Sequence, residues 1–335
     1  MSWVHAYGAF LGVLCGDAAG ATLEFARGKI TNKDVERAMR MPGGGVFRVG
    51  KGQITDDSEL ALSLARGLVG KDPREGFPLN AVAEQYRRWF DSHPYDIGNT
   101  CSTAFGVSSA DEEGQWGVPM VEQSMQYNQG SEANGSLMRV LPLALWVHSV
   151  PTEKLVEMAK QEATLSHPSR VCQDCNAVYC LLVAHLITHP GDAQGALRVA
   201  EEYVLTHADA KVREWFLEES LNISKMDCTR SIGHVRWAFV LTIHFLREKE
   251  SYEHAIHETL LKGGDTDTNA AIVGGVMGAL HGVDAIPGYM KDPVLIFDCA
   301  SPSGGRLRPA DYVSSQLPAL TKSLIEIVDE GRSSN

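Results

Sequence analysis

The sequence has few aromatic residues, an excess of negative over positive charge, and almost no alternating hydrophobic pattern. Aromatic side chains make up 7% of its 335 residues, and 30 Lys and Arg stand against 42 Asp and Glu, a formal net charge of −12. This balance argues against nucleic acid and anionic membrane surfaces as partners, because both attract positively charged proteins. An anionic substrate would have to be held by a metal ion, backbone amides or helix N-termini.

The sequence also lacks a long uninterrupted apolar run. No such run reaches the roughly 18 residues that a membrane span needs. The apolar stretch near the N-terminus is interrupted by Asp17, and no Lys or Arg precedes it. We therefore expect a buried first helix rather than a signal peptide, and no membrane partner.

Cysteine is present, but its spacing does not indicate disulfides or a metal site. The seven cysteines are irregularly spaced and odd in number, which favours reduced thiols and a cytoplasmic location. Cys172 and Cys175 form a CxxC motif without a second CxxC or a paired His motif. We interpret them as small buried hydrophobic residues on a helix, with a zinc or redox role as the alternative.

Apolar residues at three- and four-residue spacing dominate the sequence and predict an all-α protein. Asp192, Thr152 and Ser251 are expected to be N-caps. Strand-like alternation is confined to Gly45–Val49, and no linker divides the chain. We therefore expect residues 1–335 to form a single compact domain of orthogonally packed helices that acts as a monomer. Helices beyond the first are expected within 58–68, 72–93, 151–165, 176–189, 191–208, 235–248 and 310–330.

Two clusters rich in Asp and Thr precede two apolar helical segments that lie far apart in the sequence. Thr55–Asp57 opens the helix at 58–68, and helix capping alone would account for one such cluster. Asp265–Thr268 repeats the arrangement, and its two Asp exceed what a cap requires. The segment that follows contains Gly274, Gly275 and Gly278. Each costs roughly 1 kcal/mol relative to Ala in a helix, which is tolerated where another backbone approaches closely.

If the two clusters converge, their carboxylates need cations. Neighbouring carboxylates a few Å apart repel by about 4 kcal/mol per pair at an effective dielectric near 20. Two divalent ions would balance the charges of Asp56, Asp57, Asp265 and Asp267. Carboxylate and Thr hydroxyl ligands select Mg²⁺ or Mn²⁺, and the absence of His from both clusters disfavours zinc. Such a pair of ions can activate water and bind a ribose diol or phosphates.

Four segments resemble the ADP-ribosylglycohydrolase family, which includes the dinitrogenase-reductase-activating glycohydrolases and the ADP-ribosyl-arginine and -serine hydrolases. They are GDAAGATLEF (Gly16–Phe25), GGGVFRVGKGQITDD (Gly43–Asp57), NGSLMRVLPLAL (Asn134–Leu145) and GGDTDTNAAIVGGVMGALHG (Gly263–Gly282). The resemblance implies a single all-α domain and two Mg²⁺ or Mn²⁺ ions. It also implies hydrolysis at C1″ of ADP-ribose carried by a protein or a small molecule.

The resemblance also assigns roles to residues. In the motif DIGNT (Asp96–Thr100), Asp96 approaches the scissile bond. Ser58 stands where relatives often carry Thr, which keeps the hydroxyl group. His234 stands where relatives often carry a Tyr that stacks on adenine. This departure affects the expected stacking on adenine and the affinity for it. The implied metal ligands are Thr55, Asp56, Asp57, Asp265, Asp267 and Thr268. The implied substrate contacts are Gly98, Asn99, Thr100, Asn134, Gly135, Ser136, Met138, His167, Gly233 and His234.

Several candidate residues have a structural alternative. Glu24 is the candidate for proton transfer or for ordering a water, and otherwise a solvated loop carboxylate. Asp96 either pairs with a guanidinium leaving group or caps the helix that begins near Asn99. Asp17 is expected to cap or pack within the first helical turns. Arg139 is expected to pair with a buried acid rather than with phosphate, and His167 is either a satisfied helix-terminal histidine or a ligand contact.

Arginine-linked ADP-ribose is the expected substrate, because of the match to GDAAGATLEF and DIGNT. Serine-linked ADP-ribose, O-acetyl-ADP-ribose and ADP-ribosylated small molecules such as nucleobases stay open. A DDxxD motif would require an acidic residue four positions after Asp56, and none stands there. An isoprenoid synthase is therefore disfavoured. A non-catalytic ADP-ribose-binding protein would be expected to lack acidic ligands, and all four Asp of the two clusters are present.

Overall fold

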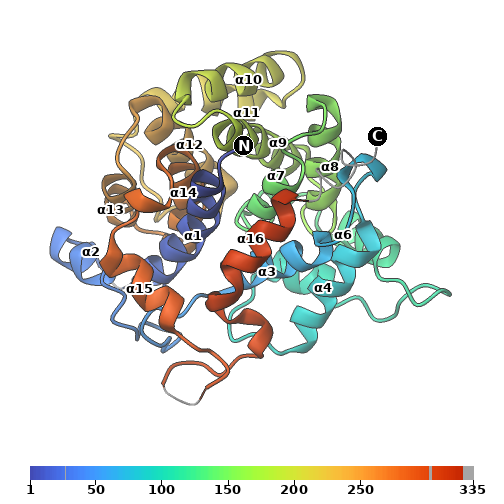
Figure 1. The fold of residues 1–335 in the computed structure, drawn as a ribbon, viewed down its shortest axis with the longest axis horizontal. Helices are drawn as coiled ribbons and strands as arrows, with labels where there is room; N and C mark the ends of the chain where they lie inside the picture. Colours follow the sequence, from blue (N-terminus) through green and yellow to red (C-terminus); the bar gives the residue numbers. More distant parts are fainter. Residues whose placement is uncertain (27, 302–303, 327–335) are drawn as a thin grey trace, which may run out of the picture.

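Two helices from opposite ends of the sequence pack together at the centre of the fold. In this computed structural model, which describes residues 1–26, 28–301 and 304–326, α1 (Trp3–Gly20) and α14 (Thr266–His281) are mostly buried. They lie side by side in Figure 1. A Cβ atom on Gly274 would lie 2.3 Å from the carbonyl oxygen of Gly12, and one on Gly16 would lie 2.1 Å from that of Ala270. This backbone-to-backbone contact explains Gly274 and Gly278 of α14, whereas a Cβ atom on Gly275 would instead lie 2.1 Å from the Tyr179 hydroxyl.

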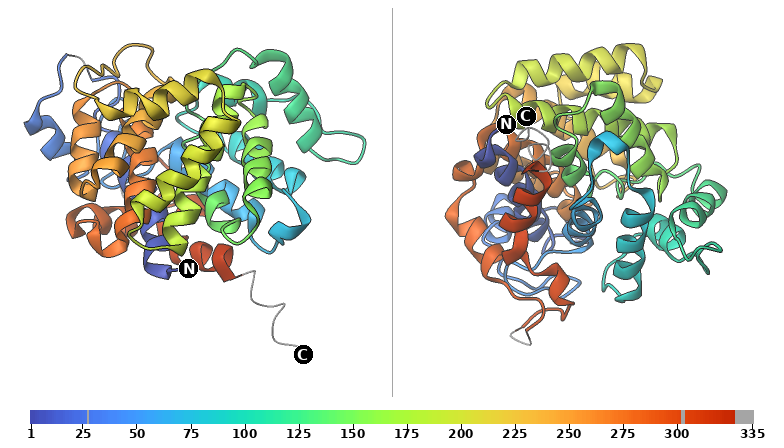
Figure 2. Two further views of the ribbon diagram at one scale, coloured as in Figure 1. Left: turned by 90° about the horizontal axis from the view of Figure 1, so that it is seen from above. Right: turned by 45° about the vertical axis from the view of Figure 1, so that its right-hand side comes forward.

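The other helices surround this central pair. Helices α3 and α16 lie on one side of α1, α12 and α13 pack against α14, and α10 lies at an edge of the molecule (Figures 1 and 2). These further helices of the described residues are α2 (Asn32–Ala38), α3 (Asp56–Leu68), α4 (Leu79–Asp91), α5 (Asn99–Phe105), α6 (Gly117–Tyr127), α7 (Leu141–Trp146), α8 (Thr152–Thr164), α9 (Arg170–Thr188), α10 (Ala193–Thr206), α11 (Ala210–Leu217), α12 (Val235–Glu248), α13 (Tyr252–Leu261), α15 (Gly288–Ile296) and α16 (Leu317–Glu326).

The all-α prediction is confirmed, since the described residues contain no β-strand and Gly45–Val49 takes part only in an isolated bridge between Gly44 and Val49. The segment 72–93 is not one helix. A 3₁₀ turn at Pro73–Glu75 is separated from α4 by Gly76, at φ 100°, and by Pro78, because proline cannot continue a helix. The segment 310–330 begins with two 3₁₀ turns before α16, and its part from residue 327 lies outside the described residues.

Two of the three predicted helix caps are confirmed. The side chain of Asp192 accepts a hydrogen bond from the N–H of Gly195, and that of Ser251 accepts one from His254. The prediction for Thr152 is wrong, because Pro151 occupies the N-cap and Thr152 is the first residue of α8.

Helix α9 is the one helix of the described part of the chain that has the length and mean hydropathy to cross a membrane. The search for uninterrupted apolar runs missed it because Gln173 and Asp174 break the run. Most of α9 is buried against α7, α8, α10 and α14, as expected for a core helix. Cys172 and Cys175 lie on this helix as buried free thiols, which confirms the structural interpretation of the CxxC motif.

Candidate metal and substrate site

The N-terminus of α3 is capped by Asp17 from α1. The N–H of Thr55 donates to both carboxylate oxygens of Asp17 at 3.1 and 2.9 Å, and the N–H of Ser58 donates at 3.2 Å. The Thr55 hydroxyl also donates to Asp17 at 2.8 Å. Asp17 is therefore structural, as predicted, but it caps a helix distant in sequence rather than its own. Because this cap comes from α1, Asp56 and Asp57 are not needed to cap α3.

The N-termini of α3 and α14 bring carboxylates together. One oxygen each from Asp17, Asp57 and Asp267 lies within 4.8 Å of the others, and Glu24, Asp96 and Asp267 form a second such group. Asp267 belongs to both groups, and neither contains His or Cys. Sequence reasoning missed that Asp17 joins the cluster, although an Asp inside an apolar helix was a visible sign of it.

Buried polar atoms at this site lack protein partners. Glu24 Oε2, Asp57 Oδ1, Ser58 Oγ and both polar atoms of the Asn269 side chain are buried without a hydrogen bond. Leaving such atoms unsatisfied costs free energy. The candidate ligands are all oxygen atoms, and some of the carboxylate oxygens lack a hydrogen-bond partner. Such a site fits a hard divalent cation such as Mg²⁺ or Mn²⁺.

Burial among like charges raises the pKa values of these carboxyl groups. Burial is the main cause of a pKa of about 9 for Glu24, and the charges of Asp96 and Asp265 add to it. Burial also raises the pKa of Asp96 to about 7, with Asp265 and Asp17 contributing, and that of Asp17 to about 6. The same cause raises the pKa well above its usual range in Asp56, Asp57 and Asp267. Without cations, these groups therefore bind protons more tightly than free carboxyl groups do.

The metal-free protein should lose stability as pH rises from 5 to 9. A raised pKa means that the folded state binds protons more tightly than the unfolded chain, so the stabilisation is complete below the unfolded pKa values near 4. It is lost as pH passes the folded values of about 6, 7 and 9 for Asp17, Asp96 and Glu24. Divalent ions would replace these protons, so the rise in Tm caused by added metal should grow with pH.

Thermal unfolding with EDTA or with MnCl₂, at pH 5 and at pH 8.5, measures this effect. We expect the metal-induced shift in Tm to be at least about twice as large at pH 8.5, reaching about 4 °C or more at 100-fold excess over Kd. Equal shifts at the two pH values would contradict proton displacement by the metal.

The carboxylates line a cleft of about 500 Å³. Most of the predicted site residues meet there. Those that line it are Glu24, Asp56, Asp96, Gly98, Asn99, Thr100, Asn134, Gly135, Met138, His167, Gly233, Asp265, Asp267 and Thr268. The predicted residues outside its lining are Thr55, Asp57, Ser136 and His234. Of these, Asp57 belongs to one of the two groups of close carboxylate oxygens, and the Thr55 hydroxyl donates to Asp17 of the same group.

Hydrogen bonds join the Asn134 loop to the two neighbouring segments of the site. The Asn134 side-chain N–H donates to Asp265 at 2.8 Å, and its backbone N–H donates to the carbonyl of Gly233 at 2.9 Å. A Cβ atom on Gly135 would lie 2.9 Å from His167 Cε1 and 3.1 Å from Cys101 Sγ. Glycine therefore lets this loop pass close to His167.

His167 is fully buried and has one ring nitrogen without a protein partner. Its Nδ1 lies 2.8 Å from the Ser166 hydroxyl, while Nε2 has no hydrogen bond. Burial, with the nearby charge of Arg139 as a second cause, holds the pKa of His167 well below its usual range, so the ring is neutral at pH 7. Of the two alternatives, this geometry favours a ligand contact over a satisfied structural histidine.

Two structural alternatives are decided by hydrogen bonds. Arg139 Nε donates to Glu162 Oε1 at 2.6 Å with both side chains fully buried, which confirms the expected buried acid partner. The N-cap residue of α5 is Gly98, without a side-chain cap. Asp96 is therefore not the cap of this helix, which leaves it available to the cleft.

His234 takes part in local contacts outside the cleft lining. Its Nδ1 accepts a hydrogen bond from the N–H of Arg236 at the start of α12, and its Nε2 lies 3.2 Å from Glu132. A role for His234 in adenine binding stays a prediction. Two large apolar side chains that line the cleft are exposed instead: Phe25 is 53% exposed and Ile232 is 50% exposed. Sequence reasoning missed both.

Phe25 and Ile232 also line a second hollow of about 710 Å³, which adjoins the cleft and has apolar walls that include Leu23, Met226 and Leu261. A further hollow of about 790 Å³ has none of the residues of the two carboxylate groups in its lining.

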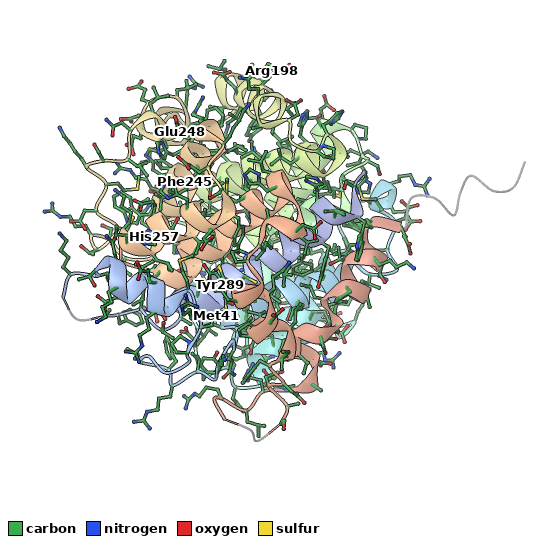
Figure 3. The ribbon with its side chains drawn as sticks, turned by 60° about the vertical axis from the view of Figure 1, so that its left-hand side comes forward. Met41, Arg198, Phe245, Glu248, His257 and Tyr289 are labelled. Carbon is green, nitrogen blue, oxygen red and sulfur yellow. The ribbon has the colours of Figure 1, made fainter. Side chains whose placement is uncertain are left out.

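The further hollow, between α2, α13 and α15, carries no comparable chemistry. Its lining includes Tyr289 and His257, which Figure 3 labels on this face of the molecule. The guanidinium of Arg40 stacks on the Tyr289 ring at 5.3 Å, and the Tyr289 hydroxyl donates to Glu253. Because these groups are already paired and no carboxylate group of the kind described above lines it, we place the functional site in the acidic cleft.

Comparison with known proteins adds to this picture. The sequence model of the ADP-ribosylglycohydrolase family matches residues 4–312. A relative from Rhodospirillum rubrum, the ADP-ribosyl-dinitrogen reductase glycohydrolase, is 32% identical, over 84% of this chain and 87% of the relative. The ADP-ribosylarginine hydrolase Tri1 of Pseudomonas putida (strain GB-1) is 28% identical, over 84% of this chain and 72% of Tri1. A solved ADP-ribosylglycohydrolase-related protein complex shares the fold, with a TM-score of 0.74 and 24% identity, over 97% of this chain and 98% of that chain.

Proposed function

The chain belongs to the ADP-ribosylglycohydrolase family, and on this premise we propose that it removes ADP-ribose from modified arginine side chains with the help of divalent metal ions. The observation that carries the proposal is the convergence of carboxylates from α1, α3 and α14 with Glu24 and Asp96. A similar relative, Tri1, is named an ADP-ribosylarginine hydrolase, which supports the choice of arginine.

The proposed cofactor is a pair of Mg²⁺ or Mn²⁺ ions. The residues that would hold them are Thr55, Asp56, Asp57, Asp265, Asp267 and Thr268. When bound, such ions supply the positive charge that holds ribose hydroxyls and activates water. Asp57, whose Oδ1 has no protein partner, and Asp267 belong to the groups of close carboxylate oxygens, which supports these two members of the set.

Glu24 is the proposed proton carrier. Hydrolysis forms a bond from water to C1″ and breaks the bond from C1″ to the guanidino nitrogen, so the water loses a proton and the leaving group gains one. Glu24 lines the cleft, its Oε2 has no protein partner, and burial raises its pKa to about 9 without cations, which supports a proton-carrying role. The neighbouring carboxylates would stabilise the positive charge that develops on the ribose.

Asp96 is the residue proposed to recognise the leaving group. A guanidinium is planar and cationic, and a carboxylate can accept two of its N–H groups. Asp96 lies with Glu24 in one oxygen group and is free of a capping role. The second hollow, which shares Phe25 and Ile232 with the cleft, offers apolar surface beside Glu24 for the polypeptide that carries the arginine.

The other substrates remain alternatives within the same chemistry: serine-linked ADP-ribose, O-acetyl-ADP-ribose, and ADP-ribosylated small molecules. A non-catalytic ADP-ribose-binding protein is disfavoured because the acidic residues are all present. We also propose a monomer in the cytoplasm, without nucleic acid or membrane partners, which the buried free thiols and the net charge of −12 support.

A panel of defined conjugates tests the leaving group. We expect the wild-type protein with Mg²⁺ to release ADP-ribose fastest from arginine-linked substrate, with products resolved by mass. Asp96→Ala should lower kcat/KM for the arginine-linked substrate by about 100-fold, equivalent to roughly 2.7 kcal/mol, which is within the range for charge-assisted hydrogen bonds. The serine-linked rate should change by only a few-fold. An equal loss of kcat/KM on both substrates would show that Asp96 does not recognise the guanidinium.

A further inference from the structure

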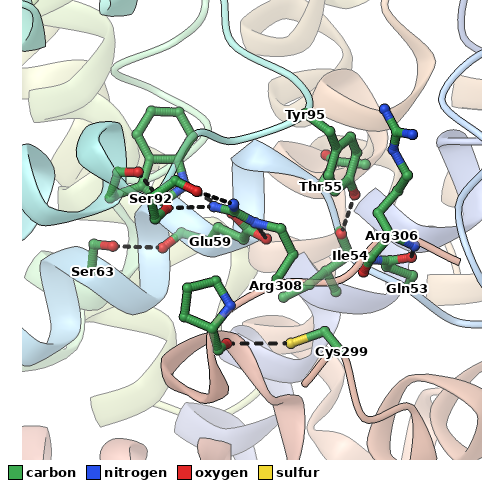
Figure 4. Close-up of polar contacts among 12 residues, drawn as sticks. Gln53, Ile54, Thr55, Glu59, Ser63, Ser92, Tyr95, Cys299, Arg306 and Arg308 are labelled. Carbon is green, nitrogen blue, oxygen red and sulfur yellow. Dashed lines mark hydrogen bonds and ion pairs between the residues drawn. The ribbon is translucent and has the colours of Figure 1, made fainter. Parts of the chain in front are cut away.

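A short segment near the C-terminus contacts the start of α3 at several points. We call Gly305–Arg308 the strap (Figure 4). Arg308 is 3% exposed and its guanidinium donates to both oxygens of Glu59, at distances from 2.8 to 3.1 Å. Trp89 Nε1 donates to the same carboxylate at 2.8 Å. Glu59 lies in the first turn of α3 with Asp56 and Asp57, so the strap fixes the rotation of that turn.

The strap also fixes the loop that leads into α3. The side-chain N–H of Gln53 donates to the carbonyl of Arg306 at 2.6 Å, and its side-chain oxygen accepts from the N–H of Arg306 and of Gly50, both at 2.8 Å. A Cβ atom on Gly305, which has φ +80°, would lie 2.4 Å from Gln53 Oε1. Only glycine permits so close an approach at this backbone angle.

The same strap touches the segment that carries Asp96. Arg308 donates to the carbonyl and the hydroxyl of Ser92 at 2.9 and 2.8 Å, and the Arg306 guanidinium stacks on the Tyr95 ring at 5.3 Å. The Tyr95 hydroxyl donates to the carbonyl of Ile54 at 2.7 Å. The strap therefore joins the two chain segments that bear Asp56, Asp57 and Asp96 (Figure 4).

We propose that the strap sets the affinity of the site for divalent metal, with Arg308 as its main positioning residue. Arg308 touches no residue of the proposed ligand set, so its effect passes through Glu59 and the backbone of α3. Groups that orient metal ligands from outside the coordination shell typically change metal affinity by about 10- to 100-fold when replaced. The inference rests on the metal site of the proposed function.

The test measures Mn²⁺ binding by the electron paramagnetic resonance signal of the free ion, without substrate. Arg308→Lys keeps the charge but loses the planar fork, and we expect its Kd for Mn²⁺ to rise about 10-fold or more. The variant Glu59→Gln/Arg308→Gln, which leaves no uncompensated buried charge, should show a similar rise. The metal concentration for half-maximal activity should increase in parallel, while kcat at saturating Mn²⁺ stays within about 3-fold of wild type.

Arg66 provides a matched control on the same helix. It lies toward the far end of α3, donates to the carbonyl of Asp311, and stacks on Tyr312 at 5.9 Å. Arg66 shares the Tyr312 ring with Arg308 but not the ion pair with Glu59, so Arg66→Lys should leave the Kd for Mn²⁺ within about 2-fold of wild type if the effect of Arg308 passes through Glu59. An unchanged Kd in folded Arg308→Lys, with only Tm lowered, would make the strap merely structural and overturn this inference alone. A wild-type protein that binds no Mn²⁺ would overturn the proposed function as well.

Discussion

Replacing Asp267 with Asn should reduce ADP-ribose release from arginine-linked substrate by about 10³-fold or more, a barrier increase of about 4 kcal/mol. Asp267 is the one residue that belongs to both groups of close carboxylate oxygens, and it is 1% exposed. An amide keeps the shape of the side chain but removes the negative charge that a divalent ion requires. The measurement is ADP-ribose release with and without Mg²⁺.

This variant separates a metal defect from an unfolded protein. Burial raises the pKa of Asp267 well above its usual range, so removal of this charge should not destabilise the metal-free protein. Its Tm in EDTA should equal or exceed that of wild type, and the metal-induced rise in Tm should vanish. Asp284→Asn, at an exposed position just beyond the other end of α14, should leave both readouts unchanged. Wild-type turnover by Asp267→Asn would remove the two-metal proposal.

Replacing Glu24 with Gln should lower kcat by about 100- to 1000-fold, which lies within the roughly 10²- to 10⁴-fold contribution of a positioned acid or base. Gln has the same shape but cannot carry a proton. Glu24 is only 8% exposed, its Oε2 has no protein partner, and its pKa of about 9 reflects burial next to Asp96 and Asp265. The expected result is a loss in kcat with little change in the Kd for Mn²⁺.

Two comparisons make this result specific. Glu36→Gln, at an exposed position on α2, should match wild type in kcat and in Mn²⁺ binding. If Glu24→Gln instead keeps its kcat but binds Mn²⁺ more weakly, Glu24 supports the metal and another group transfers the proton.

The helices could be predicted from sequence because their apolar residues recur with the helical period. The predicted segment 235–248 coincides with α12, and the segment that begins at Ser58 falls within α3. The break between Gly76 and Pro78 was also visible in the sequence, but the strong pattern after Leu79 obscured it. Periodicity indicates which face of a helix is buried, not which helix will cover it.

The residue types of the candidate site could be predicted, but not all of its members. Two Asp clusters at helix starts, with no His, already indicated an oxygen-only metal site. Asp17 and Arg308 could not be assigned, because their partners Thr55 and Glu59 lie 38 and 249 residues away. Nothing in local sequence sets the register between such distant segments. The position of His234 in a motif could be predicted, whereas the direction of its side chain depends on Glu132 and on the cap of α12.

The contact between Gly12 and Gly274 has a consequence for how the polypeptide is made. Helix α1, with an apolar surface nearly all round, leaves the ribosome before α14, and its backbone partner is synthesised more than two hundred residues later. During that interval this surface is open to premature collapse or to capture by a chaperone, because the contacts that would bury it do not yet exist. The central helix pair can therefore form only after α14 has been synthesised, late along this chain.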